Sequence, residues 1–165
     1  MFEVHAFNPE RQLRTLAAHR VRFVLIGALG ASLYGFPRMT ADADITPARD
    51  DENLERLASA LQELRARVFT ESVPEGLAFD CSAKTLARAP LWNLTTDAGR
   101  IDLEFEPAGT GGYNELAPNA VHRQVYGNEL LVARLEDILL SKEAAGRPQD
   151  RQDAIVIREL LRRRG

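Results

Sequence analysis

The sequence has only one cysteine, Cys81, among its 165 residues. A single thiol excludes an internal disulfide and a zinc site built from cysteines, and it favours a reducing compartment such as the cytoplasm. Long apolar runs are also missing, because the longest stretch, FVLIGALGASLYGF, is too short and too often interrupted by glycine to span a bilayer. The opening residues, MFEVHAFNPERQ, lack the apolar run of a signal peptide. We therefore expect a soluble, cytoplasmic protein with no membrane partner.

Charge of one sign is not in excess. The 21 basic and 24 acidic residues give a net charge of −3, which excludes a histone-like polycation, so any contact with nucleic acid must come from a local patch. With 45% hydrophobic and 27% charged residues, the composition is that of an ordinary globular protein. We expect a single domain over 1–165, with an N-terminal helix in 1–20, a core in 21–133 and C-terminal helices in 134–165.

Motifs of several common sites are also absent. The stretch GTGGY lacks the Lys-Ser/Thr pair of a phosphate-binding P-loop. The three histidines have no metal-ligand or triad spacing, and neither Ser32 nor Ser141 has a base partner in the sequence. The sequence therefore does not indicate a P-loop protein, a histidine metal centre or a serine hydrolase.

Helix signals stand at both ends and in the middle of the chain. Asn8 and Pro9 form a helix start, with asparagine as the cap and proline at the first helical position. An apolar stripe with charges opposite predicts a long helix that Asp50 or Asp51 caps. Further helices are expected over 28–35, over 135–146, and from about Asp150 to the end of the chain.

Strand signals fall between these helices and predict a mixed sheet. The segments VRFVLIG and TADADIT read as strands, the second stopped by Pro47. Two hairpins follow, one turned at the DAG of 97–99 and one at Gly127-Asn128. We expect a loop in EPAGTGGYNE and make no assignment for 71–90. This order predicts an α/β or α+β domain in which helices flank a mixed sheet.

Three aspartates have the pattern of metal ligands. Asp42 and Asp44 share one face of a strand, because side chains alternate with a period of two. Asp102 lies on a later strand between apolar residues, and the three carboxylates would converge if the two strands were neighbours. Hard carboxylate oxygens beside each other suit Mg²⁺, with Mn²⁺ as a substitute, and two such ions can clamp the oxygens of a phosphoryl transfer.

A phosphate site is expected just upstream of these aspartates. Gly27 ends a strand and, with Ala28, opens a short helix, where backbone N–H groups can bind an anion. Arg38 and Thr40 lie between this turn and the aspartates, where they could contact phosphate or position the turn. The residues of one strand–helix–strand unit could therefore bind both a nucleotide and its metal ion.

The stretch LIGALGASLYGFPRMTADADI resembles the signature of the nucleotidyltransferase superfamily, which has the DNA polymerase β-like fold. It is most similar to the bacterial branch of AbiEii and MenT-type toxin nucleotidyltransferases, which reads Gly-Gly-x-Ala and then Gly-x-x-Arg-x-Thr-x-Asp-h-Asp, with h apolar. The positions that fall on this pattern are Gly27, Gly35, Arg38, Thr40, Asp42 and Asp44.

Two later blocks extend the resemblance from about Val21 to the C-terminus. IDLEFEPAGTGGYNEL is similar to the strand that carries the third carboxylate, here Asp102, and LEDILLSKEAAGRPQDRQD is similar to a helix with Lys142, Arg147 and Asp150. The resemblance implies a Mg²⁺-dependent enzyme that moves a nucleotidyl group from a nucleoside triphosphate to tRNA or a protein. It also implies a toxin with a cognate antitoxin.

Other interpretations of the same residues remain open. The second glycine of the family pattern is Ala28 here, which favours a catalytically degenerate protein that binds nucleotide or a protein partner. Lys142 could simply be part of a solvated helix face, and Arg147 and Asp150 could cap a helix break rather than bind a ligand. The arginines of RELLRRRG could stabilise a helix C-terminus or grip RNA phosphates.

Overall fold

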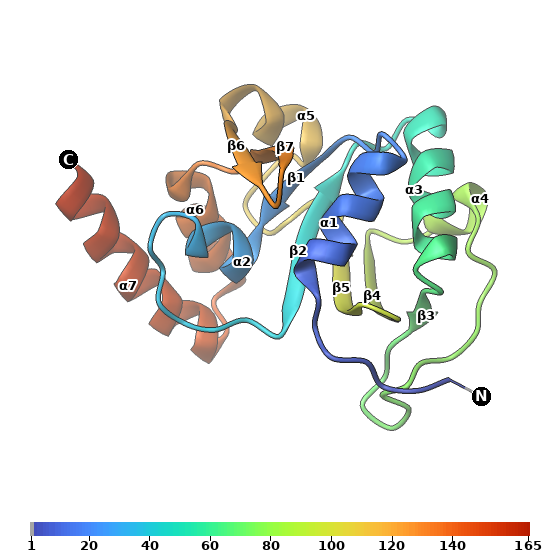
Figure 1. Cartoon of the computed structure of the whole chain (residues 1–165). Helices are drawn as coiled ribbons and strands as arrows, with labels where there is room; N and C mark the ends of the chain where they lie inside the picture. The colour runs from blue at the N-terminus through green and yellow to red at the C-terminus, as the bar shows by residue number, and fades with distance from the viewer. Residues whose placement is uncertain (1) are drawn as a thin grey trace.

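One mixed β-sheet runs through the protein, and helices pack on both of its faces (Figure 1). This computed structural model describes residues 2–165. Within that range, seven strands pair in the order β3-β4-β5-β2-β1-β7-β6. The strands are β1 (Phe23–Ile26), β2 (Asp42–Pro47), β3 (Arg67–Val68), β4 (Leu91–Thr96), β5 (Gly99–Glu104), β6 (Val121–Val125) and β7 (Asn128–Val132). The expected mixed sheet with flanking helices is confirmed.

The helices begin and end largely at the residues that their caps predict. Asn8 Oδ1 accepts a hydrogen bond from Arg11 N at 3.0 Å, and the Asp50 side chain accepts one from Asn53 N. In the part of the chain that the structure describes, no helix has the length and apolar character needed to cross a bilayer. The helices are α1 (Pro9–Ala18), α2 (Gly27–Ser32), α3 (Asp51–Glu63), α4 (Ala83–Leu86), α5 (Tyr113–Leu116), η1 (Ala117–Asn119, a 3₁₀ turn), α6 (Leu135–Ala145) and α7 (Pro148–Arg164).

The two faces of the sheet have different roles. One face packs on α1 and α3, and apolar residues from every second position of the central strands, such as Leu25 and Ile45, fill that core. The opposite face packs near β1 on α2, α6 and α7, through Ile26 and Ile138 among others. Because side chains alternate, Asp44 projects from this second face, which we call the functional face because it carries the predicted metal ligands.

Strand pairing brings the predicted ligands into register. β2 pairs with β1 in antiparallel fashion and with β5 in parallel fashion. Asp44 lies opposite Ile26 on one side and opposite Asp102 on the other. The two aspartate-bearing strands are thus neighbours, which is the condition that convergence of the carboxylates required.

The C-terminal helices α6 and α7 meet at a sharp break. Gly146 ends α6 in a left-handed conformation with a φ of 65°. Pro148 then occupies the first turn of α7, so this helix begins at Pro148 rather than at about Asp150. Arg147 is the N-cap, and Asp150 accepts a hydrogen bond from Arg147 N and closes a capping box, so the capping interpretation that the sequence left open has a structural basis.

Two local expectations were wrong, and the segment left unassigned contains regular structure. The second hairpin turns at Tyr126 and Gly127, both with positive φ, and Asn128 already belongs to β7. The loop expected in 106–115 contains the start of α5. The unassigned segment 71–90 contains α4 and a bridge between Leu77 and Val68. All three are short features, and little periodic signal announces them in the sequence.

Candidate functional site

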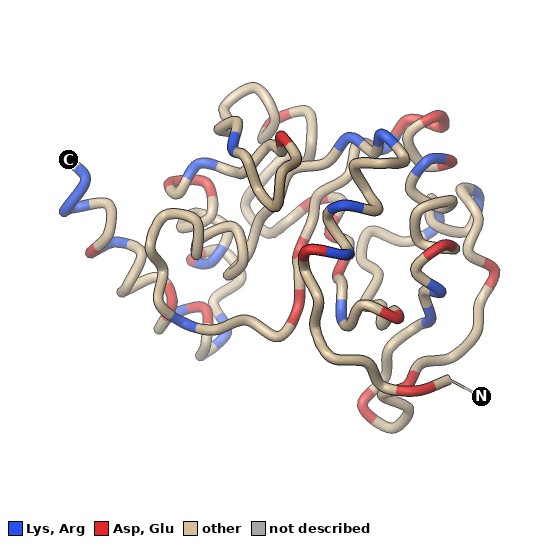
Figure 2. The backbone as a smooth tube through the Cα atoms, viewed as in Figure 1, with Lys and Arg blue, Asp and Glu red and all other residues tan. Residues whose placement is uncertain are grey.

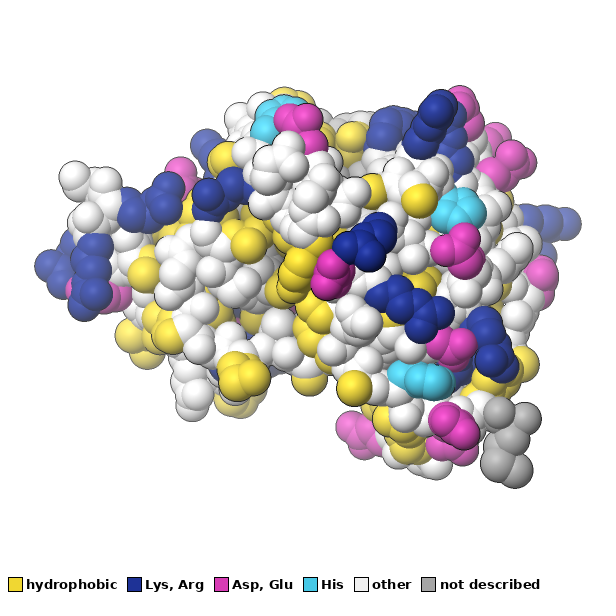
Figure 3. Space-filling model, in the orientation of Figure 1, with side chains coloured by type: hydrophobic (Ala, Val, Ile, Leu, Met, Phe, Trp, Pro, Cys, Tyr) yellow, Lys and Arg dark blue, Asp and Glu magenta, His cyan; other side chains and the backbone are white. Residues whose placement is uncertain are grey.

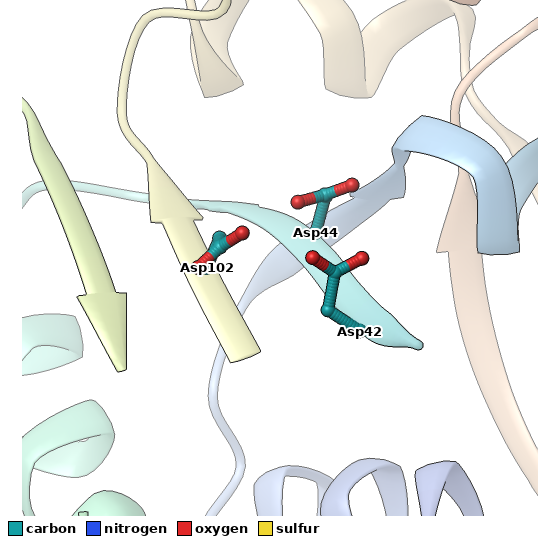
Figure 4. A group of neighbouring side chains, drawn as sticks. All are labelled: Asp42, Asp44 and Asp102. Carbon is teal, nitrogen blue, oxygen red and sulfur yellow. The ribbon is translucent and has the colours of Figure 1, made fainter. Parts of the chain in front are cut away.

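The three predicted carboxylates converge on the functional face. Asp42, Asp44 and Asp102 each offer one carboxylate oxygen, and these oxygens lie within 4.8 Å of one another. Figure 4 shows the three side chains projecting to the same side, two from β2 and one from the neighbouring β5. The arrangement follows directly from the parallel register of the two strands.

Asp44 is packed against the Gly27 turn. Gly27 has a φ of +66°, a conformation that favours glycine, and a Cβ at this position would lie 2.9 Å from both Cβ and Cγ of Asp44 and closer still to Oδ2. The absent side chain is therefore what lets the carboxylate approach the backbone. Burial, and then repulsion from Asp42, Glu104 and Asp102, raises the pKa of Asp44 well above its ordinary value. A cation at this position would relieve both effects.

Asp102 has a nearby positive charge. Arg100 Nη2 donates a hydrogen bond to Asp102 Oδ1 at 3.0 Å. Burial nevertheless raises the pKa of Asp102 to about 6, against the lowering effect of Arg100 and with a further raising contribution from Asp42. One arginine therefore only partly offsets the cost of crowding these acids together.

Thr40 hydrogen-bonds to Asp42, whereas Ala28 is buried at the start of α2. Thr40 Oγ1 donates to the carbonyl oxygen of Asp42 at 2.8 Å and lies 3.3 Å from Asp42 Oδ1, so it fixes the start of β2. Ala28 is the second residue of α2 and is buried, with 4% of its surface exposed. These contacts favour a positioning role for Thr40 over contact with phosphate, the two options that the sequence left open.

A cavity of about 320 Å³ adjoins the carboxylate cluster at Asp44. It lies between the functional face of the sheet, the loop after β5, and helix α6. Two basic side chains, Lys142 and Arg147, contribute positive charge to a lining that is otherwise mostly acidic or apolar. The lining includes Ile26, Gly27, Asp44, Glu104, Lys142 and Arg147. Of the eight residues predicted for the site, Gly27, Asp44 and Lys142 line this cavity.

Asp153, which the sequence analysis missed, ties together two predicted phosphate-binding residues. Its buried carboxylate accepts two hydrogen bonds from Arg38, at 3.0 and 2.7 Å, and one from Lys142 Nζ at 3.0 Å. Burial alone would raise the pKa of Asp153, but these bonds and one from Gln149 lower it below its ordinary value. Arg38 is therefore held on Asp153. The spacing of Asp150 and Asp153, three residues apart on one helix face, was the available signal.

The terminal arginines are partly paired within their own helix. Arg162 and Arg163 both contact Glu159. Figure 2 shows acidic and basic positions interspersed along α7, with basic ones at its end. On the face shown in Figure 3, basic side chains lie in separate groups, with acidic side chains between them. That face does not present the continuous basic stripe typical of a nucleic-acid footprint.

Comparison with known proteins places this geometry in a known fold. No protein-family model matches the chain, and no curated protein is similar to it in sequence. Among solved structures, the lincosamide antibiotic adenylyltransferase LnuA, bound to lincomycin, superposes with a TM-score of 0.61 at 12% identity, over 94% of this chain and 99% of that one. The chain has the nucleotidyltransferase fold.

Two further structures agree with this assignment of fold. A proposed nucleotidyltransferase from Thermotoga maritima, TM1012, gives a TM-score of 0.54 at 18% identity, over 96% of this chain and 97% of that one. The antibiotic-resistance factor ANT(2'')-Ia gives 0.53 at 13% identity, over 94% and 90%. The resemblance to the superfamily is thus supported at the level of fold. The narrower placement in the AbiEii and MenT-type branch stays a prediction.

The donor set of this nucleotidyltransferase fold suits a hard divalent cation. All three side chains offer carboxylate oxygens, which Mg²⁺ and Mn²⁺ prefer, and no sulfur or imidazole is among them. Gly27, which has no side chain, leaves the room that the Asp44 carboxylate occupies. The residues present therefore fit a magnesium site, with room beside it for a phosphate-bearing ligand in the adjoining cavity.

Proposed function

We propose that the protein is a Mg²⁺-dependent nucleotidyltransferase that moves a nucleotidyl group from a nucleoside triphosphate to an acceptor. The observation that carries this proposal is the convergence of Asp42, Asp44 and Asp102 within 4.8 Å, on the functional face of a nucleotidyltransferase fold. Catalysis of this kind depends mainly on positioning and on electrostatic stabilisation of phosphate oxygens. The carboxylates, the Gly27 turn and the adjoining cavity supply the parts that it needs.

The donor nucleotide would bind across the Gly27 turn and into the cavity. Gly27 and Ala28 would offer backbone N–H groups to phosphate, while Lys142 and Arg147 would add positive charge from the opposite wall. Asp42, Asp44 and Asp102 would hold the metal beside the triphosphate, and Asp102 would also help to activate the acceptor hydroxyl. A bound Mg²⁺ ion would neutralise developing charge on the transferred phosphate. Arg38 and Thr40 would act by positioning, through Asp153 and Asp42.

The acceptor would be tRNA or a protein, as the resemblance to the toxin branch implies, and an antitoxin would then be the regulatory partner. The lincomycin-bound neighbour LnuA adds a small-molecule acceptor as a third class to be tested. The arginines at the end of α7 give little support to an RNA acceptor, because Arg162 and Arg163 already pair with Glu159. A labelled triphosphate incubated with each acceptor class would distinguish them.

The first test is calorimetric titration of each of the four nucleoside triphosphates, with Mg²⁺ and with EDTA. Metal-dependent binding that Asp42→Asn abolishes would support the site and identify the donor. Binding that is indifferent to Mg²⁺ would favour the second candidate, a degenerate protein that binds nucleotide or a protein partner. The buried Ala28, which offers no hydroxyl to a phosphate, is the observation behind that candidate.

Asp44→Asn tests the chemistry directly. The amide keeps the shape of the side chain but removes its charge, so we expect a folded protein whose metal-dependent transfer falls by about a hundredfold or more. Circular dichroism and thermal unfolding provide the folding control. Retained transfer in well-folded Asp44→Asn would refute the proposed function.

A further inference from the structure

Arg100 occupies a position that the proposed function does not use. It lies on β5 two residues before Asp102, so the two side chains share one face of the strand. In the parallel register of β2 and β5, Arg100 is also the Cα partner of Asp42. A guanidinium group therefore lies beside the candidate metal ligands, where it attracts the same carboxylates that would bind the ion.

Three contacts fix the Arg100 side chain. Its Cζ atom lies 3.6 Å from the centroid of the Phe69 ring, and its Nε donates to the carbonyl oxygen of Leu94 at 3.2 Å. Its Nη2 then donates to Asp102 Oδ1 at 3.0 Å. The first two contacts do not involve the carboxylates, so the guanidinium is held in place before it meets Asp102.

The pair between Arg100 and Asp102 is mostly shielded from solvent. The Arg100 side chain is 27% exposed and that of Asp102 is 13% exposed. One oxygen of Asp102 is therefore occupied by an internal cation, at a place where Asp42, Asp44 and Glu104 already crowd negative charge together. The ion pair therefore joins a guanidinium that other contacts hold in place to one of the candidate metal ligands.

We propose that Arg100 is a positioning residue for Asp102: its guanidinium orients this carboxylate and competes with the divalent ion for it. The inference rests on the proposed function, because it assigns Asp102 a role in transfer. Transfer requires an oriented Asp102 carboxylate. The same contact with Arg100 weakens metal binding, because the guanidinium and the ion compete for one carboxylate. Removal of Arg100 should therefore have opposite effects on the two, with tighter metal binding and slower transfer.

The test measures Mn²⁺ alone, by calorimetry and by the paramagnetic signal of the free ion, in wild type, Arg100→Ala, Arg100→Lys and Arg49→Ala. We expect Arg100→Ala to bind Mn²⁺ about two- to fivefold more tightly, the scale of one partly exposed charge interaction. Its transfer rate at saturating nucleotide should fall by about tenfold or more, because a misplaced carboxylate loses its alignment. The KM for the triphosphate should change little.

Arg49→Ala is the matched control. Arg49 also places its guanidinium over an aromatic ring, with its Cζ 4.7 Å from the centroid of Phe105, and the substitution also removes one positive charge. It should leave both Mn²⁺ affinity and transfer unchanged. Arg100→Lys keeps the charge but loses the planar group that stacks and donates, so Mn²⁺ affinity should return to the wild-type value while the rate recovers only in part.

The outcomes separate the inference from the proposed function. Unchanged or weaker Mn²⁺ binding in folded Arg100→Ala would overturn the positioning role, as would an equal gain in affinity in Arg49→Ala. Should wild type transfer nothing from any triphosphate, the proposed function fails, yet the Mn²⁺ measurements still decide whether Arg100 competes for Asp102. Thermal unfolding of each variant, without metal, identifies any protein that has simply lost its fold.

Discussion

Gly27→Ala is the change that the structure predicts most sharply. At a φ of +66° any side chain is strained, and an added Cβ would also lie 2.9 Å from two carbon atoms of Asp44, where an ordinary contact is about 3.5–4.0 Å. The strain alone costs about 1–2 kcal/mol of the free energy of unfolding. The close contact has a second effect, because the Asp44 carboxylate must move by about 1 Å, a displacement on the order of those that cost a hundredfold in rate.

Gly127→Ala is the control for that prediction. Gly127 has a φ of +81°, but a Cβ there would have no atom within 4 Å, so the substitution brings the backbone strain without the contact. Urea unfolding should show similar losses of about 1–2 kcal/mol for both variants. Mn²⁺ titration should show weakened binding for Gly27→Ala only. Equal Mn²⁺ affinity in the two variants would refute the argument that Gly27 exists to admit Asp44.

Two further predictions concern stability. Asp153→Asn should lower the free energy of unfolding at pH 7 by about 2–4 kcal/mol, because it weakens a buried acceptor shared by Arg38 and Lys142. The pKa of Asp153 is lowered in the folded state, so its contribution to the free energy of unfolding is present above the unfolded pKa and is lost as the pH falls through the folded pKa. The difference in stability between Asp153→Asn and wild type should therefore close below about pH 4. Urea titrations at several pH values would measure this. Asp97→Ala should lower the free energy of unfolding by about 3 kcal/mol, because it leaves the guanidinium of Arg67, whose side chain is 1% exposed, without its carboxylate partner. A thermal midpoint within about 1 °C of wild type would contradict this.

The candidate ligands were predictable because strand periodicity is local. The alternation in Asp42-Ala43-Asp44 alone puts two carboxylates on one face of a strand. The apolar residues on either side of Asp102 are enough to predict that it also lies on a strand. Their convergence was not predictable from periodicity, because it depends on β2 pairing in parallel with β5, two strands that lie far apart in sequence. The sequence analysis left the pairing as a condition, and the resemblance pointed only to Asp102 as the third carboxylate.

Asp153 and Arg67 show where sequence reasoning stops. Asp153 bonds to Arg38 across 115 positions of sequence, and a buried aspartate on a charged helix looks like any solvated one. Arg67 donates to the carbonyl oxygens of Glu3, Arg65 and Glu75, which helps order a segment without periodic pattern. The position of the turn at Tyr126 was predicted wrongly for a different reason, because tyrosine rarely adopts the positive φ of 51° that it has here.

The distribution of charge around the cavity argues for a cation as part of the working site. On the helix side, every nearby base has an acidic partner: Arg38 and Lys142 bind Asp153, and Arg147 binds Asp150. On the sheet side, Arg100 pairs with Asp102, and Lys142 and Arg147 act on the other acids only from a distance. Burial with mutual repulsion therefore still raises the pKa of Asp44, Asp102 and Glu104. A structure selected only for stability would pair these acids as it pairs those of α7. Their crowding instead leaves the negative charge that a divalent ion neutralises, and that ion would in turn attract the phosphates of a nucleotide into the adjoining cavity.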